Sequence, residues 1–141
     1  MSQQNISPTW YRLQDPISNE WIAVNASALT LSFEKTQNHH KFSFIFALYD
    51  EYKRPCFYIF SHEVNKFLVI TEASRQITAT EDCVSEADSF SFDVQSGGTW
   101  TLAANSDDPW TTGEDEDPIV LGTDSTANVA KTLISFVPST P

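Results

Sequence analysis

The segment "WYRLQDPISNEW" at residues 10–21 decides the fold, because its pattern of apolar residues occurs twice more along the chain. An aliphatic residue is followed eight positions later by an aromatic one at Leu13 and Trp21, at Ile59 and Phe67, and at Leu102 and Trp110. Each copy closes on a Ser-Phe pair, at residues 43–44, 91–92 and 135–136. This repeated spacing indicates three copies of one structural unit, at about residues 9–50, 56–96 and 99–138.

Short runs of alternating apolar residues predict β-strands within each copy. The first copy contains "WYRL", "WIAV", "LTLSF" and "FSFIF", separated by turn-forming segments such as "QDPISNE" and "NASA". No segment has the sustained period of a long helix, and a turn around residues 125–131 is the helix candidate. The sequence therefore predicts an all-β fold of about twelve short strands in one domain, residues 1–141.

Three copies of a four-strand unit resemble the β-trefoil, in which six strands form a barrel and three hairpins cap one end. Closure is also expected from the pattern alone, because a closed barrel leaves no strand edge exposed. On this fold the tips of the cap hairpins are "NASA" at 25–28, "TEASRQ" at 71–76 and "TGEDEDP" at 112–118. The first of these tips carries no charged residue, whereas the other two do.

The strand segment "KFSFIFALYD" at residues 41–50 is apolar on both faces. Alternation directs four residues into the barrel, namely Phe42, Phe44, Phe46 and Leu48. Five residues of this strand and the next are expected to form an exposed apolar patch: Ile45, Ala47, Tyr49, Tyr58 and Phe60. Because monomers rarely expose such a patch, we expect it to form the contact of a homodimer. The alternative is that the N-terminal residues 2–8 cover it.

The charge and composition of the chain exclude several classes of partner. Nineteen Asp and Glu against eight Lys and Arg give a net charge of −11, and no basic cluster stands out, so nucleic acid is not an expected partner. No apolar run reaches the roughly 18 residues of a membrane span, and the first residues lack the pattern of a signal peptide. We expect a cytoplasmic protein without membrane contact, the alternative being export without a classical signal. Cys56 and Cys83 could pair, but free thiols are favoured.

Groups for catalysis are few. The three histidines, His39, His40 and His62, are expected to be solvated loop residues, since nothing in the sequence brings one of them to a cysteine. The acidic run at 113–118 lacks the spacing of a calcium loop and is interpreted as a solvated hairpin tip, so no metal is expected. No fingerprint for a cofactor or a catalytic nucleophile is present. We expect a protein that is not an enzyme and has no cofactor.

A short, acidic, cysteine-poor chain with this repeat resembles the β-trefoil protease inhibitors of mushrooms, the mycocypin, cospin and cocaprin types. The resemblance implies reversible inhibition by surface loops inserted into the clefts of papain-like cysteine proteases, and also of aspartic, pepsin-like proteases. Loss of water from an inserted loop costs least for small uncharged side chains. We therefore predict that Asn25, Ala26, Ser27 and Ala28 form the protease-binding loop. An ordinary hairpin turn is the alternative. For trypsin-like enzymes, Arg75 is the candidate.

Carbohydrate binding is the alternative function. The QxW motif of ricin-type lectins is absent, since the corresponding places read Phe42-Ser43-Phe44, Phe90-Ser91-Phe92 and Ile134-Ser135-Phe136. Other trefoil lectins lack that motif. Trp110 beside Asp107 and Asp108 is the best aromatic and carboxylate combination for a sugar, although the repeat makes Trp110 a core residue by analogy with Trp21.

Overall fold

A computed structural model of the chain describes residues 10–15, 18–35, 40–51, 53–71, 75–94, 99–103, 110–112, 120–121, 129–131 and 134–139. The first repeat contains β1 (Trp10–Gln14), β2 (Trp21–Val24), β3 (Leu31–Glu34) and β4 (Phe42–Tyr49). The second contains β5 (Pro55–Ser61), β6 (Lys66–Ile70), β7 (Ile77–Glu81), the 3₁₀ helix η1 (Glu86–Asp88) and β8 (Phe90–Val94). The third contains β9 (Thr99–Ala103), β10 (Trp110–Thr112), β11 (Val120–Leu121), β12 (Val129–Lys131) and β13 (Ile134–Ser139).

Six strands close into a barrel, as the sequence predicts. The antiparallel pairs run from β1 to β13, β9, β8, β5 and β4, and the pair of Tyr11 with Phe42 joins β4 back to β1. The first and last strands of every repeat therefore belong to the barrel. Each of the six members therefore has a neighbouring strand on both sides, although β4 meets β1 at one residue pair only.

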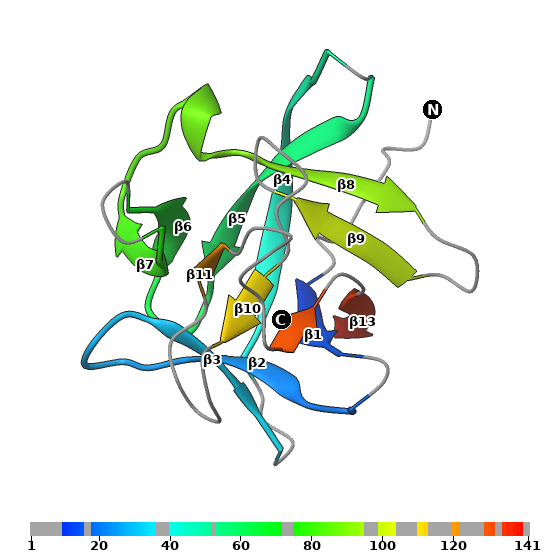
Figure 1. Ribbon diagram of the computed structural model, residues 1–141. Helices are drawn as coiled ribbons and strands as arrows, with labels where there is room; N and C mark the ends of the chain where they lie inside the picture. Colours follow the sequence, from blue (N-terminus) through cyan, green and yellow to red (C-terminus); the bar gives the residue numbers. More distant parts are fainter. Residues whose placement is uncertain are drawn as a thin grey trace, which may run out of the picture.

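The inner strands of the repeats form hairpins outside the barrel. β2 pairs with β3, and β6 pairs with β7. These two hairpins lie beside each other (Figure 1), because the backbone of Thr30 bridges to Thr78 and the amide of Ala79 donates to the carbonyl oxygen of Leu29 at 2.8 Å. In the third repeat, β10 pairs with β11 on one side and β12 on the other.

β12 corrects one prediction. The sequence suggested a helical turn around 125–131, yet Val129–Lys131 forms a strand along Trp110–Thr112. Residues 125–128 lie outside the described residues. Pairing with β10 gives the backbone groups of this segment partners that an isolated helical turn would leave to water. The short helix η1 was not predicted, and the carboxylate of Asp88 accepts from the amide of Ser85 at 3.1 Å at its start.

The first two repeats share backbone detail as well as strand order. The amide of Asn25 donates to the carbonyl of Thr30, and 46 residues later the amide of Thr71 donates to the carbonyl of Gln76. Left-handed residues recur at the same interval, at Leu29 (φ 62) and Arg75 (φ 55) and at Asn19 (φ 64) and Asn65 (φ 57). The two hairpins are therefore copies of one turn geometry.

The core fills the barrel and the base of the hairpins. The aliphatic residues that mark the first two repeats, Leu13 and Ile59, are fully buried, and so are Phe42, Phe90 and Ile134. Burial of each such side chain contributes roughly 1.5–3 kcal/mol to folding.

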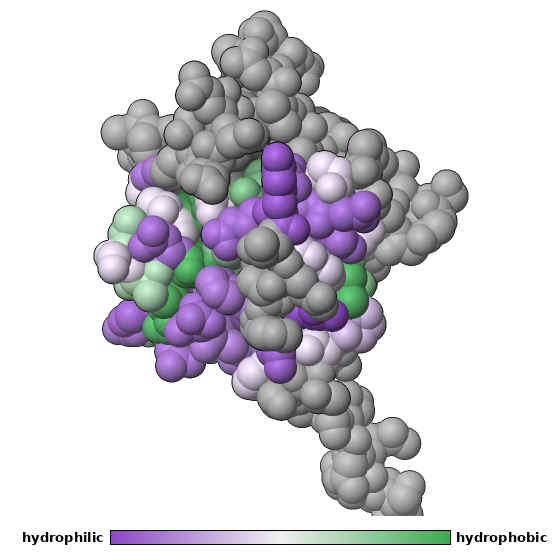
Figure 2. All heavy atoms as spheres, turned by 90° about the horizontal axis from the view of Figure 1, so that it is seen from below, coloured by the Kyte–Doolittle hydropathy of each residue, from purple (hydrophilic) through white to green (hydrophobic). Residues whose placement is uncertain are grey.

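On the face seen from below in Figure 2, the described residues are mainly hydrophilic. No helix among the described residues is long and apolar enough to cross a membrane.

Candidate functional site

The predicted protease-binding loop is the exposed tip of the β2–β3 hairpin. Asn25 through Ala28 are all exposed, and none of the four is charged. The side-chain oxygen of Asn25 accepts from the amides of Ser27 and Ala28, both at 2.8 Å. The amide of Leu29 donates to the carbonyl oxygen of Asn25 at 2.7 Å. One side chain therefore fixes the path of the tip from within.

The base of this tip is anchored to the rest of the fold. Leu29 has a left-handed backbone (φ 62), a conformation that costs a residue with a β-carbon roughly 1–2 kcal/mol. The surrounding contacts keep it there, because the carbonyl of Leu29 accepts from Ala79 of β7. The exposed residues are thus held between two fixed points, Asn25 and Leu29.

The second hairpin tip has the same frame with a different chemistry. Thr71 occupies the place of Asn25, and its hydroxyl and the amide of Gln76 are 3.2 Å apart. Arg75 takes the place of Leu29 and is exposed, so a cation stands where the first tip has an aliphatic side chain. Residues 72–74 and the third tip, 113–118, lie outside the described residues.

The predicted apolar patch is divided by a β-bulge. Strand β4 pairs Ile45 with Tyr58 and Phe46 with Phe57, but the next pair joins Leu48 to Cys56. The extra residue at Ala47 reverses the alternation, so Leu48 shares the outer face with Tyr58 and Tyr49 turns to the face of Phe57. The faces predicted for Leu48 and Tyr49 are therefore exchanged, although Tyr49 is exposed as predicted.

Three large apolar side chains of the described residues are exposed, and all three belong to β4. Ile45 is 47% exposed, Phe46 49% and Tyr49 66%. Phe46 contacts Tyr49 with ring centres 5.0 Å apart and Phe57 at 5.9 Å. Phe46 was predicted to be interior. The register places it opposite Phe57, but about half of its surface is exposed, so that prediction is wrong.

Aromatic side chains line a groove on the outer wall of the barrel, and we call it the aromatic groove. It has a volume of about 600 Å³ and is lined by Trp10, Ser43, Phe44, Ile45, Phe60, His62 and Phe67. Four strands contribute, because the register places Ser43 opposite Phe60 and Phe60 opposite Phe67, while Trp10 precedes the pair of β1 with β4. Of the predicted patch, Ile45 and Phe60 lie in this groove.

A stacked pair forms one end of the aromatic groove. The rings of Trp10 and His62 are nearly parallel, with centres 3.5 Å apart, and Lys41 Nζ lies 6.0 Å from the centre of the Trp10 ring. The ring of Phe60 meets His62 and Phe67 edge to face, at 5.1 and 5.0 Å. These contacts fix the positions of the rings before any ligand arrives.

His62 provides the polar function of the aromatic groove. Its Nε2 lies 2.6 Å from Ser43 Oγ, within hydrogen-bonding distance. Burial lowers the pKa of His62 below its ordinary value of 6.5, and the nearby charge of Lys41 lowers it further. The imidazole is therefore neutral at pH 7. The expectation of a solvated loop histidine is wrong for His62, and His39 lies outside the described residues.

His40 is also structural. Its Nδ1 accepts from the amide of Val24 at 2.8 Å, and its Nε2 lies 3.8 Å from a carboxylate oxygen of Glu63. It thereby links β2 to the start of β4, and it too differs from the predicted solvated residue.

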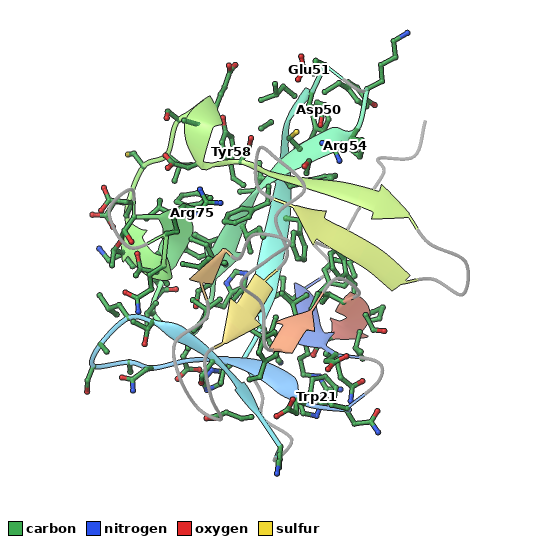
Figure 3. The ribbon with its side chains drawn as sticks, viewed as in Figure 1. Trp21, Asp50, Glu51, Arg54, Tyr58 and Arg75 are labelled. Carbon is green, nitrogen blue, oxygen red and sulfur yellow. The ribbon has the colours of Figure 1, made fainter. Side chains whose placement is uncertain are left out.

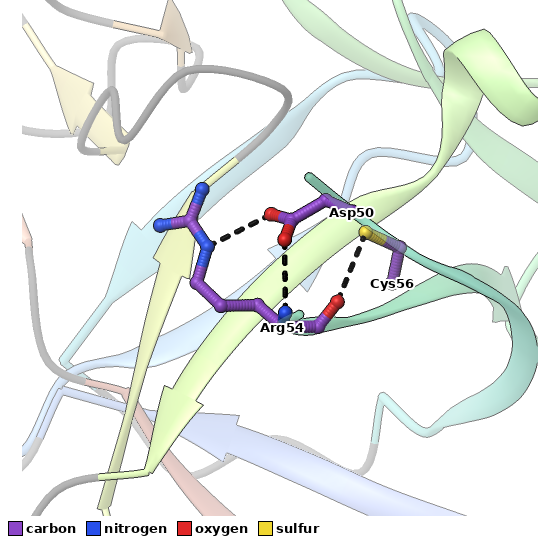
Figure 4. Close-up of polar contacts among 3 residues, drawn as sticks. All are labelled: Asp50, Arg54 and Cys56. Atoms are coloured by element: carbon purple, nitrogen blue, oxygen red, sulfur yellow. Dashed lines mark hydrogen bonds and ion pairs between the residues drawn. The ribbon is translucent and has the colours of Figure 1, made fainter. Parts of the chain in front are cut away.

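The turn between β4 and β5 holds a compact polar cluster (Figure 4). Arg54 Nε lies 2.8 Å from one oxygen of Asp50, and the Arg54 amide donates to the other at 2.8 Å. Cys56 Sγ lies 3.7 Å from the Arg54 carbonyl. Burial raises the pKa of the Cys56 thiol, and the charge of Asp50 raises it further. This thiol stays protonated and is a weak nucleophile.

Figure 3 shows that this turn, marked by Asp50 and Arg54, lies far from both Arg75 and Trp21. Cys56 is buried, Cys83 is exposed, and both are free thiols as predicted. Within the described part of the chain, no group of three or more His, Cys, Asp or Glu side chains is arranged to hold a metal ion. The sugar candidates Asp107 and Asp108 lie outside the described residues.

Comparison with known proteins bears on the fold. No protein-family model and no curated protein matches the sequence. Solved structures do match. The designed threefold-symmetric protein ThreeFoil is 15% identical with a TM-score of 0.66, covering 91% of this chain and 97% of that one. The BEL β-trefoil is 14% identical with a TM-score of 0.70, covering 97% of both chains. This chain has a β-trefoil fold.

A third similar trefoil is SeviL, solved bound to an asialo-GM1 saccharide. It is 12% identical with a TM-score of 0.63, and the match covers 95% of this chain and 98% of SeviL. At these identities the likeness shows the trefoil fold and leaves the protease-inhibitor resemblance without support from a relative.

Sequence reasoning missed the aromatic groove, although one signal for it was present. In β1 the residues Tyr11 and Leu13 face the core, so alternation places Trp10 on the outer wall. A large apolar side chain on the outer wall is expected to pack against a neighbouring side chain, because that contact removes part of its surface from water. The identity of that contact, His62, depends on pairing between strands that the repeat spacing does not specify.

Proposed function

We propose that this β-trefoil is a reversible protein inhibitor of papain-like cysteine proteases that inserts the β2–β3 hairpin tip into the protease cleft. The proposal is supported by the exposure, the lack of charge and the internal hydrogen bonds of this tip. Asn25, Ala26, Ser27 and Ala28 are exposed, uncharged and held in one conformation by the Asn25 side chain.

A tip of this kind suits insertion for two physical reasons. Removing water from methyl and hydroxyl groups costs much less than removing it from a charge, so Ala26 and Ser27 enter a cleft at small cost. A loop that is already ordered also loses little conformational entropy on binding. The amides of Ser27 and Ala28 and the carbonyl oxygen of Asn25 are used internally, which leaves the later carbonyl groups of the tip and the Ala26 amide for the protease.

The second tip provides a matched contrast within the same chain. It has the same backbone frame at Thr71 and Arg75, but it presents a cation. An acidic specificity pocket such as that of trypsin would favour Arg75. We propose the papain-like target first because the uncharged tip needs no complementary charge. Inhibition of aspartic proteases is a further proposal that rests on the family resemblance alone.

We also propose that the exposed end of β4 mediates a homodimer. The support is the exposure of Ile45, Phe46 and Tyr49 together on one strand. The bulge at Ala47 directs Tyr49 away from Tyr58, so the contact would center on Phe46 and Tyr49. Tyr49→Glu is expected to lower the hydrodynamic mass from twice that of the chain to once. A monomeric wild-type protein would exclude the dimer.

The inhibition proposal is tested with papain, trypsin and pepsin assayed against wild-type protein and two variants. Ala26→Glu combined with Ser27→Glu places two charges on the first tip and is expected to abolish papain inhibition. Arg75→Glu alters the second tip and is expected to leave papain inhibition unchanged. Both variants change exposed residues, so their thermal unfolding should match that of wild type. Absence of inhibition of all three enzymes by folded wild-type protein refutes the proposal.

Carbohydrate binding is the second candidate, and a different surface supports it. SeviL shows that a chain of similar fold holds a saccharide. In this chain the aromatic groove, and not the hairpin tip, has aromatic walls with a polar pair of the kind that such ligands use.

A further inference from the structure

We propose that the aromatic groove on the outer wall of the barrel binds a neutral saccharide through Trp10, Phe60, Phe67 and the pair of Ser43 with His62. This inference deepens the carbohydrate-binding candidate by giving it a site and a ligand class. It does not depend on the hairpin tip.

The first support is the shape and make-up of the aromatic groove. Its volume of about 600 Å³ lies within the range of about 300–1,000 Å³ that is usual for small-molecule sites. Its walls are largely aromatic, and its polar groups are few and converge on one place, Ser43 Oγ and His62 Nε2. A pyranose ring has the matching character, since its C–H groups form an apolar face and its hydroxyls lie at the rim.

The second support is the charge of the aromatic groove. The chain carries a net charge of −11, yet none of the residues that line this groove is Asp, Glu, Lys or Arg. His62 is neutral at pH 7, because burial and Lys41 both lower its pKa. A lining without charged residues suits an uncharged ligand, since removing water from a charge is costly where the walls are apolar.

The third support is preorganisation. Trp10 is stacked on His62 on one side and lies near Lys41, whose ammonium is 6.0 Å from the ring centre. Phe60 is fixed edge to face between His62 and Phe67. Rings already fixed by neighbours lose little freedom when a ligand stacks on them, which favours binding even for a small sugar.

The hydrogen-bonding pair explains the choice of saccharide over an aliphatic ligand. Ser43 and His62 share one short hydrogen bond of 2.6 Å, which leaves the hydroxyl with a remaining lone pair for a ligand hydroxyl. A purely apolar ligand would cover this pair without using that lone pair, whereas a ligand hydroxyl can donate a hydrogen bond to it.

The test is saturation-transfer NMR with three neutral probes: methyl β-D-galactopyranoside, methyl β-D-glucopyranoside and methyl α-D-mannopyranoside. We expect transfer to the ring C–H protons of at least one of them, with a dissociation constant in about the millimolar range. Phe60→Ala should weaken binding by about tenfold or more. Ile70→Ala is the matched control, since it truncates a partly buried apolar side chain of β6 that lines neither the aromatic groove nor the proposed dimer contact, and it should bind as wild type does.

A second variant keeps the rings and removes the polar pair. His62→Phe preserves an aromatic partner for Trp10 but cannot bond Ser43, so it should bind more weakly than wild type any sugar that wild type binds. Phe60→Ala should still inhibit papain if the hairpin tip is an inhibitory site, which separates the two proposals.

Three results would overturn the inference. They are no transfer from folded wild-type protein to any of the three sugars, transfer that survives Phe60→Ala unchanged, and a dimer that dissociates in Phe60→Ala. The last result would make the aromatic groove a contact between two copies of the chain.

Discussion

Replacing Asn25 by Ala tests whether the order of the hairpin tip matters for inhibition. The Asn25 oxygen accepts two hydrogen bonds of 2.8 Å, from the amides of Ser27 and Ala28. Each such bond contributes roughly 0.5–1.5 kcal/mol net. Because the tip is exposed, water replaces part of the loss, and we expect the free energy of unfolding to fall by about 1 kcal/mol. The loosened tip must be ordered again on binding, which weakens papain inhibition by about fivefold.

The matched control is Thr71→Ala, which removes the side-chain contact with Gln76 at the equivalent place of the second hairpin. It should destabilise the chain to a similar degree and leave papain inhibition unchanged. Unfolding in urea gives the stability of each variant, and inhibition constants for papain give the binding. The reasoning is refuted if Asn25→Ala is destabilised but inhibits as wild type does, or if Thr71→Ala weakens inhibition equally.

Three further predictions concern stability. Ile59→Ala removes a fully buried repeat residue and should lower the free energy of unfolding by roughly 2–5 kcal/mol in urea titrations; less than 1 kcal/mol would contradict its place in the core. The pKa of His62 is lowered in the folded state, so as the pH falls the unfolded chain binds the proton at a higher pH than the folded chain does. The free energy of unfolding should therefore fall as the pH drops below about 6.5. Between pH 7.5 and pH 5.5 wild type should lose more stability than His62→Gln, and an equal loss would refute this. Asp50→Ala removes the partly buried ion pair with Arg54 and should lower the free energy of unfolding by about 1–3 kcal/mol. Glu51→Ala changes an exposed neighbour and should lower it by less than about 0.5 kcal/mol. Equal effects of the two substitutions would show that the ion pair does not stabilise the fold.

The architecture could be predicted because it depends on a repeated spacing. The distance from Leu13 to Trp21 and from Ile59 to Phe67 marks a barrel strand followed by the start of a cap hairpin, and both aliphatic residues are fully buried. These positions must be apolar because they face the core, so the spacing between them is visible in the sequence even though the copies share few identical residues.

Single-residue irregularities could not be predicted in the same way. The bulge at Ala47 changes which face Leu48 and Tyr49 occupy, and alternation alone cannot reveal an inserted residue in a strand that is apolar on both faces. Strand β12 was missed because small residues such as those at 125–131 carry weak local preferences, and pairing with β10 decides their conformation.

The candidate sites differ in the same respect. The tip at Asn25–Ala28 is a local feature, so its exposure and its Asn-based turn could be anticipated from "NASA" between two apolar runs. The aromatic groove is nonlocal, because Trp10 and His62 meet only when β1 lies beside β4 and β4 beside β5. The aromatic residues could be read from the sequence, but their contact in the folded chain could not be predicted from it.

The most direct test of the inhibitor proposal is amide hydrogen exchange of the chain with and without an excess of papain. The account predicts added protection at the amides of residues 25–29 in the complex and no change at Thr71 and Arg75 of the second hairpin. Protection confined to another part of the surface, or no protection at any amide, would contradict insertion of the β2–β3 tip.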